Sequence, residues 1–224
     1  MSSDPETEAD AHQRQVRGLV LPQPSHPELR RLKRIHRPSA QGFKIWNATW
    51  VLLDFLGRQP LPAAPAVLDA GCGWGLAGIW LAWHRGASVL SADIDPAVFP
   101  FVDLHARLNG VGSQQARAGF DALPAPLLRD FDLLLVADAC FRDELVRPLF
   151  GLLQRARACG VPRIAVADPG RAPFGRLSDL ARQRLGARQV TWSTAEPRID
   201  WPGRTPRLEA RLLLIGDLEA PPPA

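Results

Sequence analysis

The sequence of 224 residues has no tyrosine, one methionine and three cysteines, and only Lys33 and Lys44 among its 27 basic residues are lysines. Without tyrosine, no phenolic hydroxyl can take part in binding or catalysis. The cysteines, Cys72, Cys140 and Cys159, are odd in number and lack close metal-ligand spacing. We therefore expect free thiols, with neither a disulfide framework nor a bound metal.

Long apolar runs are also missing. No run reaches the roughly 18 residues of a membrane span, and the first residues, MSSDPETEADAHQRQ, are polar and acidic, unlike a signal peptide. We therefore expect a cytoplasmic protein without a membrane partner. Hydrophobic residues make up 46% of the chain, enough for the core of one domain over residues 26–218, and we favour a monomer. Residues 1–25, polar and punctuated by prolines, are expected to be mobile and outside the core, and residues 219–224 to be a frayed tail.

The net charge is only +4, although the isoelectric point is about 9.6. Nucleic-acid-binding proteins usually carry a denser basic footprint, so we do not expect a nucleic-acid partner. The one dense cluster is 30-RRLKRIHR-37, which could face an acidic partner or phosphate. Such a run is more often a solvated helix face, and the sequence leaves both interpretations open.

Apolar runs and helical patterns alternate along most of the chain. After a helix expected over residues 41–56, the pattern predicts strands at 66–70, 88–93, 116–119, 132–137 and 162–167, helices at 75–85, 96–109, 142–159 and 175–186, and two last strands near 188–193 and 207–216. Parallel strands need crossover connections, which helices usually provide. The sequence therefore predicts an α/β fold with a seven-stranded, mostly parallel and doubly wound sheet of the Rossmann-like kind, in a single domain.

A glycine-rich stretch, 66-AVLDAGCGWGLAGIWLA-82, joins the first of these strands to the following helix. In doubly wound sheets, ligands bind beyond the carboxyl ends of the strands, where glycines let the backbone approach the ligand. Gly71, Gly73 and Gly75 have the spacing G-x-G-x-G, which differs from the G-x-G-x-x-G of a dinucleotide fold and disfavours a dehydrogenase. Asp69, just ahead of them, would repel a pyrophosphate but suits a ligand with an ammonium group.

The second strand ends at Asp93 in 88-SVLSADIDP-96, roughly 20 residues after the glycines. A carboxylate at this place can accept hydrogen bonds from a ribose diol. Together the two segments favour S-adenosylmethionine, which combines an ammonium group with an adenosine. The alternative is structural, since glycines serve tight turns and Asp95 before Pro96 could cap a helix.

On these motifs the sequence resembles the class I S-adenosylmethionine-dependent methyltransferases, whose first motif is an acidic residue followed by G-x-G-x-G. Over about residues 40–175 it further resembles family 16, the seven-β-strand protein methyltransferases. Typical of that family are a tryptophan before the first strand, here in 44-KIWNATWVLLDFL-56, and a D-x-x-[FY] motif after the fourth strand, here Asp138-Ala-Cys-Phe141. The segment 167-ADPGRAPF-174 is similar to the DPGR segment of the electron transfer flavoprotein β-subunit lysine methyltransferases.

The resemblance implies S-adenosylmethionine as the cofactor. The cofactor-binding residues that it implies, with Asp69 and Gly75 added from the first motif, are Trp46, Asp69, Gly71, Gly73, Gly75, Asp93, Phe120, Asp121 and Ala137. Phe120 and Asp121 can supply an apolar face and a hydrogen-bond acceptor for an adenine ring. Trp46 could instead pack on the helix face, with Trp50 facing inward. The sequence departs from the family at Arg142, because the family commonly has an aromatic pair there.

Asp138 and Phe141 are the candidate catalytic residues, and Asp168 and Arg171 are candidates for the substrate side. A lysine amine must lose a proton before it accepts a methyl group, and a carboxylate such as Asp138 can position it. Asp138 could alternatively cap the helix that follows, and D-P-G-R is also a good turn sequence. Arg171 could hold Asp168 or an acidic loop of a substrate.

Three functions are compatible with the sequence. We favour methyl transfer to a nitrogen, namely the side-chain amine of a lysine in a protein substrate, as the resemblance implies. A small-molecule amine methyltransferase is the second hypothesis, and a catalytically silent cofactor-binding module is the third. Asp138 with Phe141 argues against the third, because mere binding would not need a carboxylate at that strand tip. Between the first two the sequence discriminates little.

Overall fold

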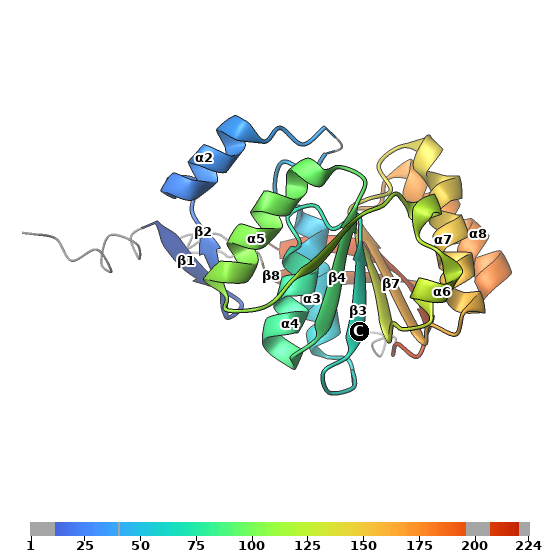
Figure 1. The fold of residues 1–224 in the computed structure, drawn as a ribbon. Coiled ribbons are helices and arrows are strands. Elements are labelled where there is room, and N and C mark those ends of the chain that lie inside the picture. Colours follow the sequence, from blue (N-terminus) through green and yellow to red (C-terminus); the bar gives the residue numbers. More distant parts are fainter. Residues whose placement is uncertain (1–11, 40, 196–206, 220–224) are drawn as a thin grey trace, which may run out of the picture.

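The computed structural model describes residues 12–39, 41–195 and 207–219. Its centre is a seven-stranded sheet in the order β5-β4-β3-β6-β7-β9-β8 (Figure 1). The strands are β3 (Ala66–Ala70), β4 (Ser88–Asp93), β5 (Gln114–Arg117), β6 (Leu133–Ala137), β7 (Arg163–Asp168), β8 (Arg188–Ala195) and β9 (Arg207–Gly216). β3 to β7 pair in parallel, and β9 pairs antiparallel with both β7 and β8. The predicted α/β fold with a mostly parallel sheet is confirmed.

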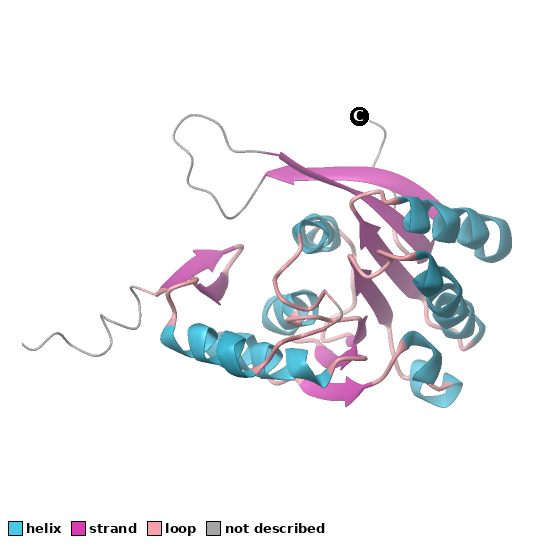
Figure 2. Cartoon of the chain, turned by 90° about the horizontal axis from the view of Figure 1, so that it is seen from above, coloured by secondary structure: helices cyan, strands magenta, loops and turns pink. Residues whose placement is uncertain are grey.

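Helices cover both faces of the sheet (Figure 2). They are α2 (Pro27–Ile35), α3 (Asn47–Gly57), α4 (Leu76–Arg85), α5 (Phe99–Leu108), α6 (Ala125–Leu128), α7 (Val146–Ala158) and α8 (Ala172–Leu185). Successive residues of β6 enter different cores: Leu133 and Leu135 join the core of α3 and α4, whereas Leu134 and Val136 join that of α7 and α8. Both faces of the strand are thus buried, which explains its continuous apolar sequence.

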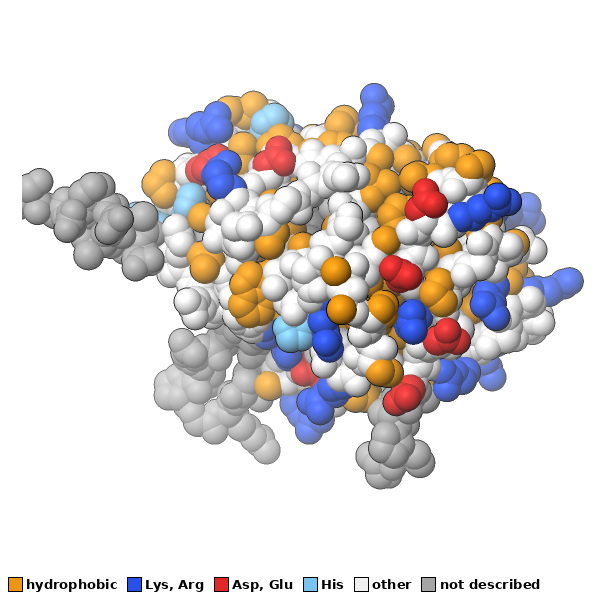
Figure 3. Space-filling view, turned by 60° about the horizontal axis from the view of Figure 1, so that its bottom comes forward, with side chains coloured by type: hydrophobic (Ala, Val, Ile, Leu, Met, Phe, Trp, Pro, Cys, Tyr) orange, Lys and Arg blue, Asp and Glu red, His pale blue; other side chains and the backbone are white. Residues whose placement is uncertain are grey.

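The described surface carries charges of both signs. Seen from below, where the parallel strands begin, basic and acidic side chains are interspersed with hydrophobic ones (Figure 3). No helix within the described ranges is both long and apolar enough to cross a bilayer.

The segment over residues 13–22 contributes side chains to the core, so the expectation that the first 25 residues lie outside it is wrong there. β1 (Gln13–Val16) and β2 (Leu19–Pro22) form a hairpin, and both turn residues, Arg17 and Gly18, have a positive φ, as in a type I′ turn. Three apolar side chains of the hairpin are buried in the core: Val16, Leu19 and Leu21. Arg17 also forms an ion pair with Asp54 of α3 at 3.0 Å. The remaining predictions for residues 1–11 and 220–224 lie outside the described residues.

The helix predicted over residues 41–56 begins later than expected, because α3 starts at Asn47 and residues 41–46 form a loop. Gln41 adopts a φ of 65°, which is incompatible with a continuous right-handed helix. The carbonyl oxygen of Gly42 accepts a hydrogen bond from Nε1 of Trp74 at 2.9 Å. A contact with a distant residue therefore overrides the local helical pattern. The other predicted boundaries agree with the structure to within a few residues.

Replacement of Leu21 by alanine should lower the free energy of unfolding by about 2 to 5 kcal/mol, because it leaves a cavity under the hairpin. Denaturation in urea measures this difference. Ile35→Ala is the control, since that side chain is 59% exposed and its loss should change stability by about 0.5 kcal/mol or less. Equal stability of the two variants would show that the hairpin adds nothing to the core.

Candidate active site

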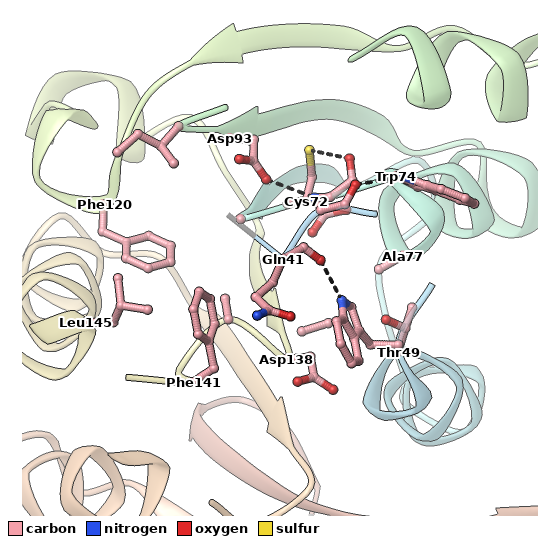
Figure 4. Close-up of a pocket in the computed structure, with 18 of the residues that line it drawn as sticks. Gln41, Thr49, Cys72, Trp74, Ala77, Asp93, Phe120, Asp138, Phe141 and Leu145 are labelled. Atoms are coloured by element: carbon pink, nitrogen blue, oxygen red, sulfur yellow. Dashed lines mark hydrogen bonds between the residues drawn. The ribbon is translucent and has the colours of Figure 1, made fainter. Parts of the chain in front are cut away.

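A cavity of about 420 Å³ lies at the carboxyl ends of β3, β4 and β6 (Figure 4). The volume is typical of small-molecule sites, and doubly wound sheets bind their ligands at this place. Eight of the nine predicted cofactor-binding residues line it: Trp46, Asp69, Gly71, Gly73, Asp93, Phe120, Asp121 and Ala137. The predicted catalytic residues Asp138 and Phe141 line it as well. The fold thus brings the motifs of distant segments into one space.

The glycine-rich turn follows β3 directly. The N–H groups of Gly71 and Cys72 both donate to one carbonyl oxygen of β4, at 2.8 and 3.1 Å. Gly73 has a φ of 54°, and a Cβ atom on it would meet no heavy atom within 4 Å, so its backbone is open to a ligand. Gly75 does not line the cavity. It starts α4 with a φ of 72°, and a Cβ there would lie 2.9 Å from Val102 of α5, so this glycine serves the turn and the helix packing.

Asp93 is the last residue of β4, and its carboxylate joins the ends of two strands. Oδ2 accepts a hydrogen bond from the N–H of Gly73 at 3.0 Å, and Oδ1 accepts one from the N–H of Asp95 at 2.9 Å. Burial raises the pKa of Asp93, although these bonds lower it. The capping role falls to Asp95, which accepts from the N–H of Ala97 at 2.9 Å. Asp93 therefore retains lone pairs for a ligand in the cavity.

Asp69 is 2% exposed, and burial raises its pKa from 3.8 to about 7. Its Oδ2 accepts a hydrogen bond from the N–H of Gly78 in α4 at 3.1 Å, which lowers the pKa, while the negative charge of Asp93 raises it. A cation in the cavity would favour the ionised form of this carboxyl group.

The ionisable groups of the cavity are mostly acidic. Those on the described residues that line it are the carboxyl groups of Asp69, Asp93, Asp121 and Asp138, the ammonium group of Lys44 and the thiol of Cys72, whose pKa is raised by burial. This balance disfavours a phosphate ligand and favours a positively charged one. The Lys44 ammonium lies 4.0 Å from the centroid of the Trp46 ring, a cation–π contact.

Trp46 and Trp50, which the sequence does not distinguish, have different places. Trp46 lines the cavity, and its Nε1 donates to a backbone carbonyl oxygen of its own loop at 3.0 Å. Trp50 is wholly buried in the core. The loop over residues 41–46 forms one wall of the cavity. It is bonded to Trp74, whose ring stacks on Phe101 with 4.8 Å between centroids.

The sequence does not predict several residues of the cavity, among them Gln41, Lys44, Ile45, Thr49, Cys72, Trp74, Ile94, Leu145 and Pro148. Residues of the 41–46 loop are not predicted because the local pattern indicates a helix there. Trp74 carries a signal that could have identified it as part of the site, because a bulky ring between two glycines of a ligand-binding turn must pack against another residue.

Asp138 directly follows β6 and adopts a φ of 59°. Its N–H donates to the carbonyl oxygen of Ala167 in β7 at 2.8 Å, so the residue still belongs to the sheet edge. Burial raises the pKa of the Asp138 carboxyl group, and the Arg171 guanidinium lowers it. The alternative that Asp138 caps the next helix is wrong, because Arg142 occupies the capping position.

Figure 4 shows where this carboxylate lies in the cavity. Asp138 is between Phe141 and Thr49, and Asp93 is on the opposite side. The two predicted substrate-side residues, Asp168 and Arg171, do not line the cavity. They lie behind Asp138, to which Arg171 is bonded. The structure therefore places both outside the cavity lining, in an ion-paired group with Asp138.

Solved structures with a similar fold are known. Precorrin 8W decarboxylase of Methanobacterium thermoautotrophicum has a similar fold, with a TM-score of 0.57 and 16% identity over 81% of this chain and 95% of that one. The precorrin-6y C5,15-methyltransferase of Geobacter metallireducens gives a TM-score of 0.53 and 12% identity over 81% and 94%. The fold is that of the class I methyltransferases.

Sequence comparison defines the family. A family model described as lysine methyltransferase matches residues 31–161, more than half of the chain. The chain belongs to this lysine methyltransferase family. Two curated relatives are named electron transfer flavoprotein beta subunit lysine methyltransferase: that of Xenopus laevis is 35% identical over 67% of this chain, and that of Danio rerio 27% over 58%. The matches span 61% and 50% of the length of these relatives.

The Asp69→Asn variant should be more stable than the native protein at pH 7.5 and about equally stable at pH 4. The folded-state pKa of about 7 exceeds the ordinary 3.8, so the folded protein binds an extra proton between these values. The native free energy of unfolding should therefore fall as the pH rises through this range, by up to about 1.4 kcal/mol per pH unit. Asparagine keeps the acceptor for Gly78 but does not ionise. Urea denaturation across the range tests this, and a difference independent of pH would contradict it.

Proposed function

We propose that the protein is an S-adenosylmethionine-dependent methyltransferase that acts on the side-chain amine of a lysine in a protein substrate. The observation that carries the proposal is the single cavity with the glycine-rich turn and Asp93 on one side and Asp138 with Phe141 on the other. Direct transfer requires that donor and acceptor meet in one space. Membership of the lysine methyltransferase family supports the proposal.

The residues of the cavity fit S-adenosylmethionine. The open backbone at Gly73 allows close approach of a ligand. Asp69 suits the ammonium group, and Asp93 retains acceptors for the ribose diol. Phe120 and Asp121 offer an apolar face and an acceptor for the adenine. When bound, this cofactor supplies a methyl group on a positively charged sulfonium.

The chain's own residues prepare the acceptor. The nitrogen of the lysine side chain must present its lone pair to the methyl group that the bound cofactor would supply. Before this, the lysine ammonium releases a proton to solvent, which costs about 4 to 5 kcal/mol at pH 7. Burial beside a positive charge reduces that cost. Asp138 accepts a hydrogen bond from the amine and orients it, and Phe141 shields the site from water.

Exposed apolar side chains next to the cavity favour a macromolecular acceptor over a small amine. Ile94 lines the cavity and is 62% exposed. Phe43 is also exposed and packs edge-on against Trp46, with 5.4 Å between the ring centroids. Hydrophobic side chains around a site of this kind are typical of protein contacts. A catalytically silent module would not account for Asp138.

The basic cluster near the cavity suggests the character of the partner. Its exposed cations form no ion pair with described residues: Arg30, Arg31, Lys33, Arg34 and Arg37. Lys33 lies 5.3 Å from the centroid of the Trp74 ring, so the cluster adjoins the cavity wall. We infer that it attracts an acidic protein surface. The electron transfer flavoprotein β subunit, named in the curated relatives, is the first acceptor to test.

A cytoplasmic location and a monomeric state stay predictions.

Asp93→Ala should weaken the binding of S-adenosylmethionine by about 1.5 to 3 kcal/mol, the usual contribution of hydrogen bonds to a charged group. Titration calorimetry measures the affinity for this ligand and for its demethylated product, and NAD should not bind. Asp103→Ala is the control, because Asp103 is an exposed carboxylate on α5 outside the cavity. An unchanged affinity of the Asp93 variant would remove Asp93 from the cofactor site.

Asp138→Asn should reduce kcat by about 100-fold or more while cofactor affinity stays nearly unchanged. Asparagine tolerates the positive φ at this position and keeps one acceptor oxygen, so the fold should be retained. Single-turnover methylation and calorimetry on the same preparation separate the two effects. Loss of the cofactor, or unfolding, would mean that Asp138 is not a residue of the acceptor side.

Incubation with labelled S-adenosylmethionine and extract from a strain that lacks the protein should label a protein band, and purified electron transfer flavoprotein β subunit is tested in parallel. Labelling should weaken as salt rises. Replacing Arg30, Arg31 and Arg34 by serine should remove most of this salt dependence, whereas Arg182→Ser with Arg184→Ser on α8 should not. Label in small metabolites alone would refute a protein acceptor, and no label at all would refute the activity.

A further inference from the structure

Arg171 forms hydrogen bonds with two aspartates, and binding of a cofactor in the cavity does not explain these bonds. Arg171 immediately precedes α8 and does not line the cavity. Its Nη2 donates to the carbonyl oxygen of Asp138 at 3.0 Å and also to Oδ1 of the same residue. Its Nε and Nη2 donate to Oδ2 of Asp168 at 3.1 and 2.6 Å. One guanidinium therefore joins the end of β6 to the end of β7.

Asp168 fixes this guanidinium in place. It is the wholly buried last residue of β7, and its Oδ1 accepts from the N–H groups of Gly170 and Arg171, both at 2.8 Å. Both carboxylate oxygens thus bind protein groups. Because Asp168 lies outside the cavity lining and both its carboxylate oxygens are already hydrogen-bonded, its interactions serve to orient Arg171.

We propose that Arg171, held by Asp168, is a positioning residue that fixes the Asp138 carboxylate for the acceptor amine. The inference rests on the proposed methyl transfer. Asp138 has a φ of 59°, a conformation that the surrounding structure must stabilise, and the bond from Arg171 to its carbonyl oxygen does so. The bond to Oδ1 sets the rotation of the carboxyl group, and the remaining lone pairs are left to accept from the amine.

Arg171 also alters the charge that the amine meets. The charged groups against Asp138 are Arg171 and Asp168, and the N–H of Ala48 at the start of α3 lowers the pKa of its carboxyl group. The other ionisable groups around the cavity are Asp69, Asp93, Asp121, Lys44 and the thiol of Cys72. An unpaired Asp138 would stabilise the lysine ammonium and oppose its deprotonation. The guanidinium offsets part of that negative charge, which favours the neutral amine.

Two substitutions separate charge from geometry. Arg171→Gln removes the charge, so the acid limb of the pH profile of kcat/KM should move up by about one pH unit and kcat should fall at least about tenfold. Arg171→Lys keeps the charge but not the forked geometry, so kcat should fall while the limb stays in place. S-adenosylmethionine affinity should remain within about twofold of native in both. Arg176→Gln is the control, because Arg176 lies on α8 and pairs at the surface with Asp143.

A double substitution tests whether Arg171 acts through Asp138. In the Asp138→Asn background, Arg171→Gln should cost less than about threefold in kcat, because the group it positions has already been changed. A full additional loss would overturn the inference. So would an Arg171→Gln enzyme with a native pH profile, or one whose cofactor affinity falls in parallel with its melting temperature.

A measurement without turnover keeps this inference distinct from the proposed function. In a carboxyl-carbon NMR titration, the pKa of Asp138 should be higher in Arg171→Gln than in the native protein and unchanged in Arg176→Gln. If the native protein methylates no acceptor, the proposed function fails, and the titration still shows whether Arg171 controls Asp138. If the native protein is active and the pKa of Asp138 does not respond, only the inference fails.

Discussion

Burial of like charges constrains the whole carboxyl edge of the sheet. Four adjacent strands bring carboxyl groups to this edge: Asp93 of β4, Asp69 of β3, Asp138 after β6 and Asp168 of β7. All four are buried, and such groups need hydrogen bonds, a partner charge or a proton. The chain uses all three solutions, and backbone N–H groups bind Asp69 and Asp168 as well. Backbone N–H groups bind Asp93, burial raises the pKa of Asp69 to about 7, and Arg171 bridges the remaining two.

These solutions divide the cavity into two halves. On the side of the glycine-rich turn, Asp69 and Asp93 have no cationic partner among the described residues. On the other side, Asp138 is already paired with Arg171. A positively charged cofactor would relieve the repulsion in the first half, whereas the second half would suit the amine of the proposed reaction, which must be neutral when it reacts. The unpaired carboxyl groups thus lie where the proposed reaction needs a positively charged cofactor, and the paired carboxyl group lies where it needs a neutral amine.

The succession of strands and helices along the chain, and the glycine-rich turn, could be predicted from the sequence. Apolar runs and glycine spacing are local signals. The hairpin and the 41–46 loop could not, because their conformations depend on distant contacts such as Arg17 with Asp54 and Trp74 with Gly42. The same limit applies to Arg171. Its sequence neighbours allow a turn, a pair with Asp168 or a substrate contact, and only the placement of β6 beside β7 shows that it also binds Asp138.

An arginine suits position 171 better than a lysine for chemical reasons. Burial by itself lowers the pKa of Arg171, but the hydrogen bonds to Asp168 and the charge of Asp138 outweigh this effect and raise the pKa above its ordinary value. The guanidinium therefore stays charged at neutral pH. A lysine there would lose the fork that binds two carboxylates and would place a second amine beside the acceptor position. Of the two lysines in the chain, Lys44 alone lines the cavity, and its ammonium is engaged by the Trp46 ring. A guanidinium therefore supplies positive charge next to Asp138 without supplying a competing nucleophile.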